Sequence, residues 1–324
     1  MHNRLLVTGG CGFIGSAFIR MALKRGDFQG RVINLDALTY AANPHALAAI
    51  ENDIRYRFFH GDICDEMLVE KICQEENIDA IIHFAAETHV DRSIESAMPF
   101  IKTNVEGTMH LLEVVRKYKH IHFHHVSTDE VYGALGQTGR FNETSHYRPN
   151  SPYSASKAAS DHLVRAYANT YGISTTISHC SNNYGPFQHK EKFIPLLIHR
   201  CLESKPIPIY GDGSAVRDWL YVDDHAEAIW EILQHGQPHE TYDIGGGEEM
   251  SNLSLAHLIL ERLAEKMKCC TEKYVSLLTF VKDRPGHDFR YAIDSSKIQK
   301  ELQWKPKIKF FEGISKILCQ LHRN

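Results

Sequence analysis

A glycine-rich turn near the start of the chain is the feature that most limits its fold. Residues 4–8 are apolar enough for a buried strand, residues 9–15 read GGCGFIG, and residues 16–24 have the apolar spacing of a helix. A strand, a glycine-rich turn and a helix in this order are typical of a dinucleotide-binding unit. Gly9, Gly12 and Gly15 let the backbone approach a pyrophosphate, and the helix N-terminus stabilises its negative charge.

An acidic residue after the second predicted strand indicates which dinucleotide is bound. Residues 31–35 form that strand, and Asp36 follows at about the twenty-residue offset expected after such a turn. A carboxylate there accepts hydrogen bonds from the ribose hydroxyls of the adenosine and repels a 2′-phosphate. Ala37 and Leu38 come next and offer no cation for that phosphate. We therefore expect NAD as the cofactor, and not NADP.

Strands and helices alternate through the first half of the chain. Further strands are predicted at 56–60, 80–84, 121–126 and 175–179, with helices at 67–75, 99–118 and 151–171. This alternation predicts an α/β fold with a doubly wound, Rossmann-like parallel sheet. After Cys180 the elements become shorter and less regular. We expect an NAD-binding domain at 1–181, with return segments near 217–246, and a smaller, mixed C-terminal substrate lobe at 182–324.

Two motifs carry the candidate chemistry. The fifth strand ends in Thr128, Asp129 and Glu130, which places a hydroxyl and two carboxyl groups at the edge where open α/β sheets bind ligands. Tyr153 and Lys157 are four residues apart on a predicted helix, so both side chains lie on one face. A cation beside a phenol should lower the pKa of Tyr153 and make it a base for an alcohol proton.

Composition and charge exclude several other classes of protein. The net charge is -4, and Lys and Arg are spread along the chain, so we expect neither nucleic acid nor a membrane surface as a partner. No apolar run is long enough for a membrane span, and because the first residues lead straight into a strand, we expect no signal peptide. The eight Cys show no zinc-like spacing, which favours reduced thiols and a cytoplasmic location.

The many histidines raise the question of a metal site. His120, His122, His124 and His125 lie close together, but only alternate residues of a strand share a face. An acidic partner at ligand spacing is missing from the sequence around them. We expect no metal, and a structural role for these histidines.

Taken together, the motifs resemble those of the extended short-chain dehydrogenase/reductase family, and within it the nucleoside-diphosphate-glucose 4,6-dehydratases. The likeness covers nearly the whole chain, including HFAAETHVDRSI at 83–94 and the stretches at 182–186, 191–192, 217–222 and 283–294. Asp129 is the sharpest discriminator, because the matching residue of the related epimerases and decarboxylases is typically not acidic. A dehydratase needs an acid there, since hydroxide is a poor leaving group.

The resemblance implies dehydration of a nucleoside-diphosphate-glucose, dTDP-glucose above all, to the 4-keto-6-deoxy sugar with tightly bound NAD. By the same resemblance, Tyr153, assisted by Lys157, removes the 4-hydroxyl proton, and Thr128 bonds the same oxygen. Glu130 then removes the C5 proton, and Asp129 protonates the departing 6-hydroxyl. Like charges push the pKa values of neighbouring carboxyls apart, so opposite protonation states for this pair are reasonable.

The family pattern also marks binding residues and an assembly. Those expected to touch the cofactor are Gly9, Gly12, Phe13, Ile14, Gly15, Asp36, Thr39, Asp62, Ile63, Ala85, Thr103, Tyr153, Lys157 and Asn183. Those expected to meet the sugar nucleotide are Thr88, Asn182, Glu191, Lys192, Arg217, Asn252, Arg284 and His287. The resemblance further implies a homodimer built from the helices at 99–118 and 153–171.

Alternatives remain open at this stage. UDP- or CDP-glucose is possible in place of dTDP-glucose. A UDP-sugar epimerase or decarboxylase would have the same fold, although the acid pair at 129 and 130 argues against both. A non-catalytic NAD-sensing protein is the rival from another class, and the intact Tyr153 and Lys157 argue against it.

Overall fold

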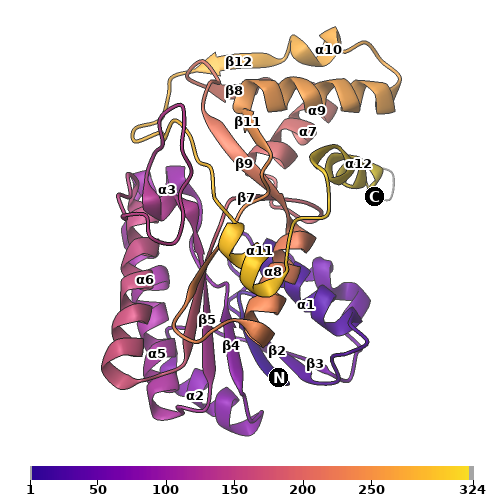
Figure 1. The fold of residues 1–324 in the computed structure, drawn as a ribbon. Helices are drawn as coiled ribbons and strands as arrows, with labels where there is room; N and C mark the ends of the chain where they lie inside the picture. Colours follow the sequence, from indigo (N-terminus) through magenta and orange to yellow (C-terminus); the bar gives the residue numbers. More distant parts are fainter. Residues whose placement is uncertain (1, 321–324) are drawn as a thin grey trace.

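A computed structural model describes residues 2–320 of the 324-residue chain, and a seven-stranded parallel sheet forms its centre (Figure 1). The strand order is β10-β6-β5-β4-β1-β2-β3. The strands are β1 Arg4–Thr8, β2 Arg31–Asp36, β3 Tyr56–His60, β4 Ala80–His83, β5 His122–Thr128, β6 Thr175–Cys180 and β10 Thr241–Ile244. The order reverses between β1 and β4, which is the switch point where such sheets bind ligands. The predicted doubly wound fold is confirmed.

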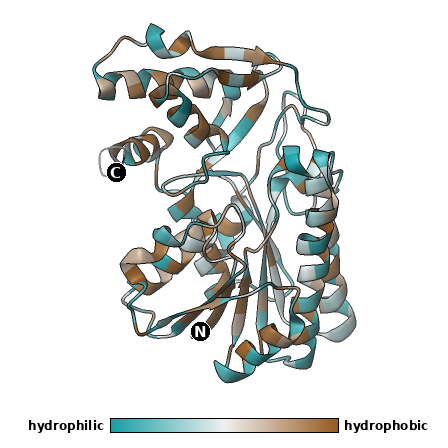
Figure 2. Ribbon diagram, turned by 180° about the vertical axis from the view of Figure 1, so that it is seen from behind, coloured by the Kyte–Doolittle hydropathy of each residue, from teal (hydrophilic) through white to brown (hydrophobic). Residues whose placement is uncertain are grey.

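The two faces of the sheet are covered by different helices, as alternation along each strand requires. Leu5 and Val7 of β1 pack with α1 (Phe13–Lys24), α8 (Val222–His235) and α11 (Ser296–Leu302). Leu6 points the other way and packs in the core formed with α2 (Glu66–Glu75), α5 (Thr108–Lys117) and α6 (Pro152–Tyr171). Strands buried on both faces are usually apolar, as β1 and β4 are, and Figure 2 shows brown strands in the middle of the sheet. β5 and β6 differ, because they carry buried His, Ser and Thr side chains.

The second half of the chain builds two small sheets and a separate core. β7 (Asn182–Tyr184), β9 (Val216–Tyr221) and β11 (Glu249–Ser251) form a mixed three-stranded sheet, and β8 (Ile207–Tyr210) pairs with β12 (Leu278–Val281). Packed here are α7 (Phe193–Leu202), α9 (Asn252–Met267), α10 (Glu272–Val275) and α12 (Phe310–Gln320). The smaller mixed sheets agree with the expected C-terminal lobe. The exact division at residue 181 stays a prediction.

The helix expected at 99–118 differs in the structure. It is divided into α4 (Met98–Phe100), a π-helical stretch η2 (Ile101–Gly107) and α5. The wider turn brings the buried Asn104 against the loop after β4, where its Oδ1 accepts from Glu87 N (2.9 Å) and its Nδ2 donates to Glu87 O (3.0 Å). Nδ2 also donates to Ser156 Oγ on α6 at 2.8 Å. The π-turn thus fastens a loop of the candidate site to two helices.

Short elements complete the chain. They are the 3₁₀ helices η1 (Pro44–Ile50) and η3 (Asp129–Tyr132), and the helix α3 (Val90–Glu95). Within the described part of the chain, each helix is too short or too polar to cross a membrane.

Candidate active site

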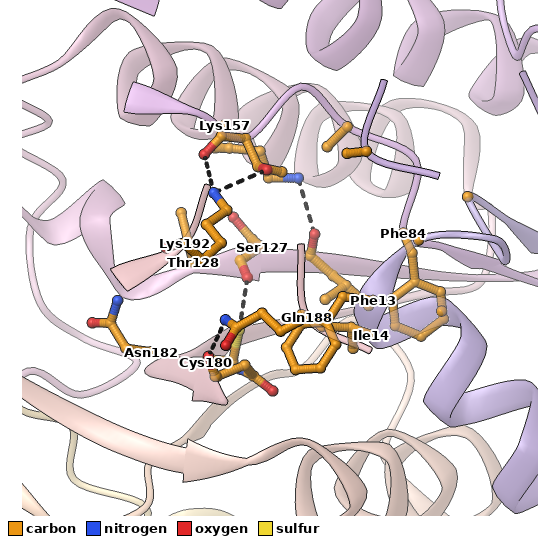
Figure 3. A pocket seen from close by; sticks show the side chains of 18 of the residues that line it. Phe13, Ile14, Phe84, Ser127, Thr128, Lys157, Cys180, Asn182, Gln188 and Lys192 are labelled. Carbon is orange, nitrogen blue, oxygen red and sulfur yellow. Dashed lines mark hydrogen bonds between the residues drawn. The ribbon is translucent and has the colours of Figure 1, made fainter. Parts of the chain in front are cut away.

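A cavity opens where β1, β4, β5 and β6 end, at the switch point of the sheet. Both predicted catalytic motifs and the glycine-rich turn meet in it. Its lining includes Gly9, Gly12, Phe13, Ile14, Gly15, Thr88, Thr128, Asp129, Glu130, Tyr153, Lys157, Asn182, Asn183, Glu191 and Lys192. In Figure 3, Phe13, Ile14 and Phe84 lie together on one side of it, and Asn182 lies on the other.

The glycine-rich turn has the close backbone packing that its sequence predicts. Gly9 has φ +70°, and a Cβ on Gly15 would lie 2.4 Å from Gly9 O. Helix α1 begins at Phe13 with no acidic residue in its first turn, and within residues 2–320 no side chain caps its N-terminus. Uncapped N–H groups at the start of a helix, facing a cavity, suit a bound phosphate.

Asp36 lies beside this turn and is nearly buried. One carboxylate oxygen accepts from Cys11 N and the other from Leu38 N, both at 2.8 Å. These bonds hold the carboxylate at the end of β2, and each oxygen keeps a second lone pair for a ribose hydroxyl. The turn and Asp36 together fit the pyrophosphate and the adenosine ribose of NAD.

The adjacent carboxyl groups of Asp129 and Glu130 lie in different surroundings. Thr128 ends β5, and its Oγ1 donates to Asp129 Oδ1 and accepts from Glu130 N, both at 3.3 Å. Asp129 is 2% exposed, and its Oδ2 has no hydrogen-bond partner among the described residues. Burial and the charge of Glu130 raise the pKa of Asp129 well above its usual value. These surroundings therefore favour the protonated form of Asp129, the form that can donate a proton.

Glu130 is surrounded by cations. Burial raises the pKa of Glu130, but Arg284, Arg217 and Lys192 act in the opposite direction. Burial thus favours the acid form of both carboxyls, and the three cations offset this effect in part at Glu130, which makes Glu130 the better base of the two.

Tyr153 and Lys157 project into the cavity from the first two turns of α6. A capping box formed by Ser151 and Ser154 fixes the start of this helix. Lys157 Nζ donates to Val126 O at 2.9 Å. The expected lowering of the pKa of Tyr153 is wrong for this structure, because burial and the charge of Glu130 raise it well above 10.

The polar wall opposite the acid pair is made by the loop after β4 and the loop before α7. Lys192 Nζ donates to Thr88 O at 3.0 Å, which joins the two loops. Glu191 Oε2 lies 3.8 Å from His89 Nε2 and 3.6 Å from Arg92. The positive charge of Lys192 and the carboxylate of Glu191 thus face the same cavity.

The other predicted substrate residues, Arg217, Asn252, Arg284 and His287, do not line the cavity. The charges of Arg217 and Arg284 nevertheless act on Glu130. Arg217 is 5% exposed, donates to Asp288 O at 3.0 Å and stacks on the Tyr291 ring at 4.4 Å. Arg284 lies 3.6 Å from Asp91, and His287 Nδ1 lies 2.7 Å from Asp283. Asn252 begins α9, and its N–H bonds Ala215 O beside β9.

The remaining predicted cofactor residues, Thr39, Asp62, Ile63, Ala85 and Thr103, are not among the residues that line the cavity. Ala85 N bonds Thr8 Oγ1 at 3.4 Å and stands between the lining residues Phe84 and Ala86. Asp62 is exposed, Ile63 is buried, Thr39 is exposed and Thr103 lies in η2. Of these, Ile63 packs in the core against Gly107, so its side chain is already in contact with other residues of the protein.

A family model described as GDP-mannose 4,6 dehydratase matches residues 6–317. The chain belongs to this 4,6-dehydratase family. A dTDP-glucose 4,6-dehydratase of Xanthomonas campestris pv. campestris is 52% identical over 320 residues, which cover 96% of this chain and 90% of that relative. A dTDP-glucose 4,6-dehydratase of Haemophilus influenzae is 51% identical over 323 residues, covering 96% and 95%.

Solved structures of the same family share the whole fold. A dTDP-glucose 4,6-dehydratase from Streptomyces venezuelae, with NAD and TYD bound, has a TM-score of 0.91 and 45% identity, and the match covers 99% of this chain and 97% of that one. The family predicted from the motifs is therefore confirmed.

Sequence reasoning missed part of the lining of this dehydratase cavity. The missed residues are Ala41, Phe84, Ala86, Val126, Ser127, Cys180, Ser181, Gln188 and His189. Most are small or apolar residues at strand ends, whose side chains carry no distinctive chemistry. A positional argument would have found Cys180 and Ser181, because Cys180 ends β6 and Ser181 follows it, as Thr128 ends β5 and Asp129 follows it.

Proposed function

We propose that the protein converts a nucleoside-diphosphate-glucose, dTDP-glucose first, to the 4-keto-6-deoxy sugar nucleotide and water. One observation carries the proposal: a buried acid, Asp129, and a cation-surrounded carboxylate, Glu130, lie in the same cavity as Tyr153 and Lys157. Elimination of water needs a proton donor for the leaving hydroxyl and a base for the carbon acid, and this pair supplies both. We place dTDP-glucose first among the possible substrates because the relatives described above are dTDP-glucose 4,6-dehydratases.

Each side chain then has one task. Tyr153 accepts the 4-hydroxyl proton as a phenolate, the form that the positive charge of Lys157 favours against burial, and the Thr128 hydroxyl bonds the same oxygen. Glu130 removes the C5 proton, which the 4-ketone has acidified, and Asp129 gives its proton to the 6-hydroxyl so that it leaves as water. The protons held by Tyr153 and Glu130 afterwards restore the C5–H bond and the Asp129 acid, so no proton is consumed.

The glycine-rich turn and Asp36 are the residues that would hold NAD. When bound there, NAD would supply a hydride acceptor for C4 and a hydride donor for C6, with no net consumption of the cofactor. For the diphosphate of the substrate, Lys192 and Arg217 are the proposed cations, with Arg284 and His287 beside them. Thr88, Asn182, Glu191 and Asn252 complete the proposed substrate contacts.

The test is mass spectrometry of the purified protein incubated separately with dTDP-, UDP- and CDP-glucose, first without added NAD. We expect the loss of one water from dTDP-glucose, and less or none from the other two. Faster conversion of UDP- or CDP-glucose would change the nucleotide but keep the reaction. Failure on all three with NAD added, followed by failure on a panel of other sugar nucleotides, would refute the proposal.

We also propose a cytoplasmic homodimer that pairs through α5 and α6. These helices lie side by side on one outer face (Figure 1). Beside them, Met98 is 71% exposed and Ile101 is 43% exposed, so the face offers apolar surface to a second copy. Sedimentation at micromolar concentration should give twice the chain mass of 37.0 kDa, and a monomer would refute the assembly.

A further inference from the structure

A row of titratable side chains continues inward from the active site along α6. Tyr153, Lys157, Asp161 and Arg165 recur every four residues, and so they share one face of the helix. Tyr153 and Lys157 line the cavity. Asp161 lies one turn further in and is fully buried. The proposed reaction gives Asp161 no task, although a buried carboxylate is costly unless it is paired.

Two histidines hold the Asp161 carboxylate. Its Oδ1 lies 3.2 Å from His125 Nε2, and its Oδ2 lies 2.9 Å from His179 Nε2. Tyr147 also donates to Oδ2 at 2.8 Å. His125 Nε2 is in turn 3.3 Å from Lys157 Nζ. His125 therefore lies between Lys157 and Asp161, and the charged groups of both residues contact the same ring nitrogen, Nε2.

The array continues to a second carboxylate. His179 Nδ1 lies 2.9 Å from Asp243 Oδ1 on β10, and His179 and Asp243 are both fully buried. Burial alone would lower the pKa of His179, but hydrogen bonds to Asp161 and Asp243 raise it to about 9. The hydrogen bond from His179 to Oδ2 and the nearby His125 ring hold the pKa of Asp161 well below its usual value despite burial. The His179 imidazolium thus lies between Asp161 and Asp243, and Arg165 is a second cation one helical turn beyond Asp161.

The other titratable groups that face Lys157 are neutral at pH 8. Burial lowers the pKa of His83 on β4 and His125 on β5, and it raises the pKa of Cys180 on β6 and Tyr153 on α6. Burial also lowers the pKa of Lys157 to about 8, and Asp161 opposes that shift. Asp161 is thus the negative charge that these surroundings supply to Lys157.

We propose that Asp161, held between His125 and His179, is a positioning residue whose carboxylate keeps Lys157 positively charged beside Tyr153. The inference rests on the proposed dehydration and adds a residue that lies outside the cavity. The consequence is a limit on the pH range of turnover. Turnover needs the Lys157 cation, and His125, Asp161 and His179 together set the pH at which Lys157 loses its proton.

The test compares Asp161→Asn with Tyr147→Phe. In the parent protein, kcat/KM should fall above about pH 8 as Lys157 loses its proton. Asp161→Asn removes the charge, so this alkaline limb should move to lower pH by about one unit, the usual effect of one nearby charge. Tyr147→Phe removes a hydrogen bond from the same carboxylate but no charge, and its limb should stay in place. An unmoved limb in Asp161→Asn overturns the proposal.

A second measurement reads Lys157 without turnover. Reductive methylation with formaldehyde attacks only neutral amines, and peptide mass spectrometry gives the pH at which half of Lys157 has reacted. That pH should fall in Asp161→Asn by the same amount as the limb, and an equal pH in both proteins would contradict the proposal. Turnover by the parent protein is established first, so its failure would count against the proposed function alone.

If Asp161→Asn does not fold, Asp161→Ser decides. This change removes the same charge and leaves a smaller polar side chain, so the alkaline limb should again move to lower pH by about one unit. A limb that stays or rises overturns the proposal, because a purely structural role gives no reason for the shift.

Discussion

At the scale of single residues, identical functional groups are made different by their surroundings. Asp129 and Glu130 are neighbours in the chain, yet Asp129 is buried with one oxygen unpaired, while Glu130 lies among Arg217, Arg284 and Lys192. Since burial favours a neutral carboxyl and nearby cations favour a charged one, the pair divides into an acid and a base.

The substitution Asp129→Asn tests this division. An amide cannot protonate the leaving hydroxyl, so loss of water should slow by about 10²–10⁴-fold, the usual contribution of a general acid. Oxidation at C4 needs Tyr153 and should change much less. Rapid-quench mass spectrometry of a single turnover should therefore show the 4-keto-glucose nucleotide accumulating. Asp27→Asn, at a side chain that is 62% exposed, is the control. Equal slowing of both steps would remove Asp129 from the acid role.

At the scale of elements, the site depends on how strand ends and helix starts are brought together. β5 delivers the acid pair, α6 delivers Tyr153 and Lys157, and the turn before α1 provides the N–H groups for a phosphate. The turn has no spare room, because Gly15 packs on the backbone of Gly9 and Gly10. Backbone cannot move aside as a flexible side chain can.

Gly15→Ala is therefore expected to damage both stability and cofactor retention. The new Cβ would lie 2.4 Å from Gly9 O, and overpacking of this kind costs about 1–3 kcal/mol. Thermal unfolding and the NAD content of the purified protein measure the two effects. Gly26→Ala is the matched control, since a Cβ there meets nothing within 4 Å. Normal NAD content in Gly15→Ala would show that the turn is looser than described.

At the scale of the whole molecule, the buried sheet carries an unusual number of neutral histidines. His122 and His124 on β5 bond hydroxyls of Ser174, Thr176 and Ser178 on or beside β6. The buried histidines whose pKa burial lowers are His83, His122, His124 and His125 on the strands and His225 on α8. The expected structural role of the histidine-rich strand thus agrees with its contacts.

These histidines predict acid sensitivity. Below about pH 6.5 the unfolded chain takes up protons on them and the folded chain does not, so the free energy of unfolding falls with pH. Carboxyls whose pKa values burial raises, such as Asp129, Glu130 and Asp218, act in the opposite direction. We expect the histidines to dominate between pH 7 and pH 5, because this range spans their ordinary pKa of about 6.5. Calorimetry across this range should show a steep drop in Tm, and a constant Tm would contradict it.

Much of the fold could be predicted because its information is local. The alternation of apolar strands and amphipathic helices fixed the parallel sheet, and β3 occupies the predicted residues 56–60. The π-turn at 101–107 could not be predicted, since it accompanies a contact between Asn104 and the backbone of Glu87, which is distant in the sequence. The raised pKa of Tyr153 escaped for the same reason: burial is a property of the packed molecule.

By itself, the sequence determined which chemical groups are present and on which faces they lie, because spacing along a strand or helix sets direction. It thereby placed the turn at 9–15, Asp36, the acid pair and the Tyr153–Lys157 pair at ligand-binding edges. Only the tertiary structure decided the charge of each group. Desolvation and neighbouring charges come from elements far apart in the chain, as His125, Asp161 and His179 show behind Lys157.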